Sequence, residues 1–166
     1  MLLRVVSLFV LSGFCAHAHA AQSFQGITCQ SDIPKALLGR TMPNERVVLT
    51  EARYKSIGLH DLGGFGVEAE GDPWFLISWQ ICGREYVLLE RHDVVRDVLV
   101  APQSASHIQS SIVSCTVDGV EQKETAVLFI PPEDLKGPTK VDGAWFIDDQ
   151  AVRFKERRGR NIVCRT

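Results

Sequence analysis

WFLISWQIC at positions 74–82 and YVLL at positions 86–89 are the most informative stretch of this chain, because only Gly-Arg-Glu separates the two apolar runs. Both runs are rich in β-branched and aromatic residues, and each is too short to cross a membrane as a helix. A short connection that contains glycine, placed between two such runs, is typical of a β-hairpin. We therefore expect this hairpin to form the centre of the hydrophobic core.

Turn signals divide the rest of the chain into short elements. Further strands are predicted at 46–50, 52–54, 112–117, 125–130, 144–147, 151–155 and 161–164. Asp118-Gly119 predicts a second hairpin, and the segment 157–160 is predicted to be the final turn. The segment 57–71 carries five glycines and is read as a loop or an interrupted strand, while 94–100 fits either a helical turn or a strand.

One short helix is predicted at 31–39, because Ser31 and Asp32 are capping residues, Pro34 falls in the first turn and Gly39 ends the segment. The expected fold is mainly β, or α+β with this one N-terminal helix. About eight short strands separated by turns indicate an antiparallel sandwich or a partial barrel.

The first twenty residues have the pattern of a secretory signal peptide. Arg4 is followed by an apolar run at 5–14 and by small residues that end at Ala20, where we predict cleavage. Cys15 follows the bulky Phe14, so a lipid anchor is not expected. Residues 21–166 then form a single domain, and we expect it to be soluble, to be periplasmic or secreted, and not to insert into a membrane.

Charge and cysteines narrow the class of protein further. Without Arg4 the mature chain has 17 basic and 20 acidic residues, a net charge of −3, which gives no reason to expect nucleic acid as a partner. Cys29, Cys82, Cys115 and Cys164 remain after cleavage, and an even number in an oxidising compartment indicates two disulfides. Three pairings are possible; we favour Cys29 with Cys82 and Cys115 with Cys164, one loop in each half.

Candidate catalytic residues do not form a recognised motif. His60-Asp61 and His92-Asp93 each pair a base with a carboxylate, but neighbours on an extended chain point to opposite faces. A metal site would need His60, His92 and Glu90 to converge, and the sequence shows no ligand-pair spacing. Neither a metal nor a cofactor is expected. An enzyme with a site near His60, His92 and Asp93 stays open as an alternative.

Arg157, Arg158 and Arg160 form the most concentrated basic cluster of an otherwise acidic chain. They are either the solvated end of a hairpin or a docking rim that steers an oppositely charged partner. By elimination, the sequence favours an exported binding protein, such as an inhibitor or immunity-type partner of another exported protein. A carrier that holds a small ligand inside a barrel is a further alternative.

Overall fold

The computed structural model describes residues 23–42, 45–67, 73–102, 109–130 and 137–165. In these residues the chain forms two α-helices, one 3-10 helix and nine strands, so the expected mainly β, antiparallel class is confirmed. The elements are α1 (Ile33–Leu37), α2 (Val47–Arg53), η1 (Lys55–Ile57), β1 (His60–Val67), β2 (Trp74–Ile81), β3 (Arg84–Arg91), β4 (Val94–Val100), β5 (Gln109–Val117), β6 (Val120–Glu121), β7 (Ala126–Ile130), β8 (Thr139–Asp148) and β9 (Arg153–Arg165). The predicted signal peptide at 1–20 lies outside the described residues.

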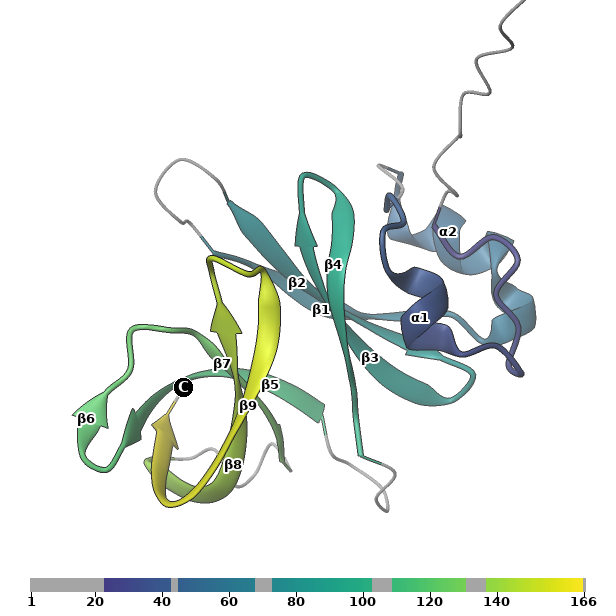
Figure 1. Ribbon diagram of the computed structural model, residues 1–166. Helices are drawn as coiled ribbons and strands as arrows, with labels where there is room; N and C mark the ends of the chain where they lie inside the picture. The colour runs from purple at the N-terminus through teal and green to yellow at the C-terminus, as the bar shows by residue number, and fades with distance from the viewer. Residues whose placement is uncertain (1–22, 43–44, 68–72, 103–108, 131–136, 166) are drawn as a thin grey trace, which may run out of the picture.

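The first sheet is an antiparallel meander in the order β1-β2-β3-β4 (Figure 1). Its central hairpin is the predicted one, and β2 pairs with β3 from Trp74 opposite Arg91 to Ile81 opposite Arg84. The turn is shorter than expected: Cys82 and Gly83 both have positive φ, as a tight turn of type I′ requires. The next turn, His92-Asp93, also has two positive φ angles, and the ambiguous segment 94–100 that follows is strand β4.

Two helices lie beside this sheet. Helix α1 is confirmed: the Asp32 side chain accepts a hydrogen bond from the Lys35 N–H at 3.4 Å, and Ile33 and Leu37 are buried. The strands predicted at 46–50 and 52–54 are wrong, because this segment folds into α2 and η1. Glu45 accepts a hydrogen bond from the Thr50 hydroxyl at 3.1 Å and forms a 2.9 Å ion pair with Arg53. These local contacts outweigh the β propensity of the two valines.

The second sheet has the order β6-β5-β7-β8-β9, and an additional pairing of β5 with β9 closes it into a small barrel. The second hairpin is confirmed as β5 and β7, with Asp118-Gly119 turning into the short β6. The final turn predicted at 157–160 is wrong, because this segment lies inside β9. The register with β8 shifts between Val141 and Gly143 opposite this segment. Gly159 therefore lies beside an irregularity within one long strand and does not end a strand.

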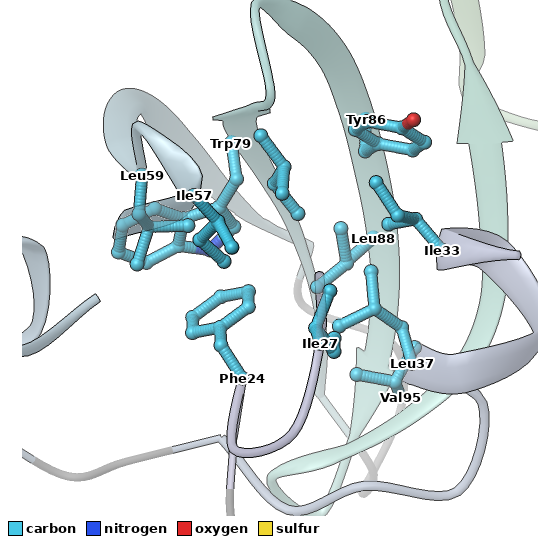
Figure 2. Packing of buried hydrophobic residues seen from close by; sticks show 11 residues of the cluster. Phe24, Ile27, Ile33, Leu37, Ile57, Leu59, Trp79, Tyr86, Leu88 and Val95 are labelled. Carbon is cyan, nitrogen blue, oxygen red and sulfur yellow. The ribbon is translucent and has the colours of Figure 1, made fainter. Parts of the chain in front are cut away.

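Three clusters of buried side chains form the core. The first packs α1 and the N-terminal segment against one face of the first sheet, where Leu37 lies against Leu88 and Val95 (Figure 2). The second lies between the two sheets and joins Val87 and Leu89 to Phe129 and Ile147. The third fills the barrel. The first sheet is thus covered on both faces, by helices on one and by the barrel on the other.

Two disulfides have the predicted pairing. Cys29–Cys82 ties the segment before α1 to the turn between β2 and β3. Cys115–Cys164 joins residues that lie opposite each other on β5 and β9 and so closes the barrel. Such bonds fit an extracellular-type, oxidising environment. None of the helices within the described ranges is long and apolar enough to pass through a membrane.

Candidate binding site

A groove of about 430 Å³ runs between α2 and the first two strands. Glu45, Val47 and Thr50 line its helical side, and Phe65, Phe75 and Trp79 line its strand side. We call this feature the α2–β1 groove. Its lining is mostly apolar with a few polar groups, which is the usual character of a binding site.

Glu51 of α2 holds the helix against the start of β1. Its carboxylate accepts a 2.8 Å hydrogen bond from the Asp61 N–H and lies 2.8 Å from the His60 ring Nδ1. The backbone donor of Asp61, followed by the hydrogen bond and charge of His60, lowers the pKa of the Glu51 carboxyl. The helix therefore has a fixed position above the strand, and the groove does not depend on a loose element.

Trp79 connects the groove to the core. Its side chain is 5% exposed, and its ring meets Phe24 edge to face, with the centroids 5.2 Å apart. Figure 2 shows Trp79 between Phe24 and Leu59 in the cluster beneath the helices. The indole Nε1 has no hydrogen-bond acceptor within the described part of the chain. The groove is therefore built on a rigid, close-packed base.

Exposed apolar side chains are concentrated on the elements that border this groove. Of the eight large hydrophobic residues that are exposed in the described ranges, six lie on α2, β1 or β2. These six are Val47, Val48, Leu49, Leu62, Phe65 and Phe75, of which Val47, Phe65 and Phe75 line the groove. Single exposed hydrophobics are normal on a protein surface, whereas larger concentrations are typical of interaction sites.

The charges beside the groove are mainly acidic. Glu45 and Asp61 are the charged residues that line it. Asp61 accepts a 3.2 Å hydrogen bond from the Gly63 N–H, and Glu45 is paired with Arg53.

The arginines predicted as a docking rim have different environments. Arg157 packs over the Phe146 ring at 4.5 Å, donates to Gln122 at 2.6 Å and pairs with Glu124 at 2.7 Å. Arg158 pairs with Glu156 and its side chain is 78% exposed, and Arg160 is also exposed. Arg157 thus supports the barrel wall, and only Arg158 and Arg160 remain as exposed members of the predicted rim.

The histidines of the alternative enzyme site are not brought together. His60 begins β1 opposite Gln80, whereas His92 lies in the turn after Arg91, which is opposite Trp74. Gln80 and Trp74 are six residues apart on β2, roughly 20 Å along a strand. In the ranges that the structure covers, no three His, Cys, Asp or Glu side chains are grouped as metal ligands would be.

The barrel interior also differs from what a small-ligand carrier needs. Val113, Leu128, Phe146 and Ile162 fill it together with the Cys115–Cys164 disulfide. Barrels this small are filled by their own side chains. A hollow of about 600 Å³ nevertheless borders the barrel cluster at Leu128, Ile130 and Val141, and the α2–β1 groove is smaller but more apolar.

The sequence did not predict the groove, because the segment that forms its helical side was interpreted as strands and the segment of β1 as a loop or an interrupted strand. One signal was present: Phe65 lies between Gly64 and Gly66 in the glycine-rich segment 57–71. Comparison of the chain with protein-family models, with curated proteins and with solved structures gave no match.

Proposed function

We propose that this chain is an exported binding protein, periplasmic or secreted, that recognises another protein through the α2–β1 groove and the apolar residues around it. The observation that carries the proposal is the concentration of six exposed large hydrophobic side chains on α2, β1 and β2. The signal-peptide pattern at 1–20 supports export. The two disulfides support function in an oxidising compartment.

The groove has the size and composition of a recognition site for side chains. Its volume of about 430 Å³ accommodates one or two large apolar side chains of a partner, and the rigid base beneath Trp79 limits the entropy lost on binding. Exposed aromatic residues are the usual anchors of protein interfaces, and Phe65 and Phe75 are 48% and 44% exposed.

Photo-crosslinking can test this proposal at a single position. A benzophenone amino acid replaces Phe65 in one variant and Val120 in a control variant, since Val120 is 64% exposed on β6, far along the chain in the barrel. Incubation with cell-envelope and extracellular material of the source organism should give an adduct at position 65 that is absent at position 120. The partner is then identified and purified.

Affinity measurement with that partner completes the test. Phe65→Ser should weaken binding at least tenfold, because it removes an aromatic anchor, whereas Val120→Ser should leave the affinity unchanged. Identical adducts at both positions, no adduct specific to position 65, or an unchanged affinity of Phe65→Ser would overturn the proposal.

A further inference from the structure

The outer edge of β1 lies between two hollows. On one face of the sheet is the α2–β1 groove, and on the other is a hollow of about 270 Å³ lined by Leu62, Ser78 and Ile112. Gly64 borders both, because it has no side chain to separate them. A strand placed alongside β1 would point its alternate side chains toward opposite faces, and each face offers a space.

Only the start of β1, where the chain bulges between Asp61 and Gly63, carries a usual protection against an added strand. After an irregularity between Asp61 and Gly63, β1 pairs regularly with β2 from Gly63 to Val67. Among the described strands none pairs with its other side. The strand HDLGGFGV contains no lysine, arginine or proline, the residues with which natural proteins commonly guard an edge.

The opposite edge of the same sheet is covered. The chain at 39–42 runs along β4, where Gly39 N–H donates to the Val95 carbonyl at 2.9 Å and Thr41 bridges Val94. Farther along β4, Asp97 accepts a 2.7 Å hydrogen bond from the Phe154 N–H of β9. Of the two edges of the first sheet, the chain itself covers the one at β4. The edge at β1 is left open in the described residues.

We propose that the outer edge of β1 receives an extended segment of the partner protein as a fifth strand of the first sheet. This inference rests on the proposed function and specifies how that site binds. Backbone hydrogen bonds to β1 supply affinity, and apolar side chains of the segment enter the groove and the smaller hollow alternately.

The acidic residues that line the groove indicate that the partner segment carries lysine or arginine. Glu45 and Asp61 are the charged residues that line the groove. Oppositely charged groups on a partner speed association and give selectivity. A second copy of this chain is disfavoured as the occupant, because it would bring together two grooves that are each lined by Glu45 and Asp61.

The test uses a synthetic library of random octapeptides, selected on the immobilised oxidised protein. Selected peptides should alternate apolar with polar residues and be enriched in lysine and arginine. Each is then made in two forms, N-methylated on one or the other alternate set of amides. One form should lose at least tenfold in affinity and the other little, because only one set of N–H groups faces β1.

Affinity measurements on variants of the protein show where the peptide binds. Phe65→Ser, at the margin of the groove, and Leu62→Ser, at the smaller hollow, should each weaken binding, and Val120→Ser should not. Asp61→Asn keeps the oxygen that accepts the Gly63 N–H, and it should reduce affinity up to about fivefold and weaken its salt dependence. Amide exchange of alternate residues in the segment 63–67 should slow when the peptide binds.

The outcomes separate the two proposals. Equal binding of both methylated forms, together with loss of binding in Phe65→Ser, would overturn strand addition and leave the groove as a binding site. Strand addition would also be overturned if the selected peptides bound Phe65→Ser and Leu62→Ser as tightly as the parent protein, or if the selection yielded no peptide. The crosslinking experiment tests the groove independently. A stable dimer of the protein that Phe65→Ser dissociates would identify a second copy as the occupant and overturn the inference.

Discussion

The two sheets of this protein treat their edges in opposite ways. The second sheet closes through the β5–β9 pairing, whereas the first stays open at β1 (Figure 1). Closure consumes backbone hydrogen-bonding groups that would otherwise attract another chain. Pairing of β5 with β9 therefore leaves the second sheet little free edge, whereas the outer side of β1 is unpaired in the described residues.

The two halves of the chain also differ in net charge. The sequence from 109 to 165 contains nine acidic and nine basic residues, whereas the sequence from 45 to 72 has a net charge of −3. In the barrel, ion pairs such as Lys155–Asp148 and Arg157–Glu124 satisfy charges within the fold. The comparison teaches that the barrel pairs many of its charges within the fold, and it supports our proposal that the open sheet and its helices form the binding surface.

The largest expected effect comes from the disulfides, of which each half has one. The loops they close have sequence separations of 53 and 49 residues, so chain entropy assigns them nearly equal stabilisation, about 4 kcal/mol each. Cys29→Ser/Cys82→Ser and Cys115→Ser/Cys164→Ser should each lower the free energy of unfolding by about 2–5 kcal/mol, measured by urea denaturation.

Accessibility distinguishes the two bonds even though entropy does not. Cys29 is exposed, whereas Cys115 and Cys164 are 2% and 0% exposed. Mild reduction of the native protein should therefore open Cys29–Cys82 first, as alkylation and peptide mass analysis would detect. Release of the barrel cysteines first would contradict the view that the barrel is the more closed half.

Two buried glutamates on β3 provide the next comparison. Glu85 accepts hydrogen bonds from the Ser110 N–H of β5 at 3.1 and 3.2 Å and so fastens the open sheet to the barrel. Glu90 is 3% exposed, and its Oε1 has no hydrogen-bond partner in the described structure. Burial, with a smaller contribution from the charge of Asp93, raises the pKa of Glu90 to about 7.

This shift predicts that stability falls as the pH rises. The folded protein binds the Glu90 proton more tightly than the unfolded chain, so the contribution is fully present below about pH 4.5 and is lost as the pH rises through 7. Glu90→Gln should flatten that dependence and raise the free energy of unfolding at pH 8 by an amount on the order of 3 kcal/mol.

Glu85→Gln is the matched control, because it places an amide where the Ser110 N–H requires an acceptor. It should lower the free energy of unfolding by about 1 kcal/mol. Denaturant melts of both variants and the parent between pH 5 and pH 8 would measure the two effects. If Glu90→Gln destabilised the protein at pH 8, the assignment of Glu90 as an uncompensated buried charge would be wrong.

Arg157 and Arg158 compare a charge held by the barrel with one at its surface. Arg157→Ala should cost about 1–2 kcal/mol, since it removes the contact with Phe146 and leaves Glu124 without its partner. Arg158→Ala should change stability by less than about 0.5 kcal/mol, because exposed ion pairs contribute little. Thermal melts of the two variants test this; equal effects would contradict the supporting role of Arg157.

Local patterns predicted those features in which sequence and tertiary structure agree. The central hairpin, α1 with its Asp32 cap and both disulfides follow from residues close in sequence or from cysteine arithmetic. Helix α2 could not be predicted in this way, since Thr50 and Arg53 find their partner in Glu45 only once the helix has formed. The groove was missed with it, because its helical side was predicted to be strands and the segment of β1 was left open between a loop and an interrupted strand.

The smallest expected effect tests whether the exposed hydrophobics serve binding or stability. Val48 on α2 is 62% exposed, whereas Val95 on β4 is fully buried. Val48→Ser should change the free energy of unfolding by no more than about 0.5 kcal/mol, because little apolar surface is removed from the core. Val95→Ser should cost about 2–4 kcal/mol, since it leaves a cavity and buries a hydroxyl. Urea melts of the two variants make the comparison. A large loss in Val48→Ser would show that the fold itself requires this surface, and the apolar residues around the groove would then need no partner to explain them.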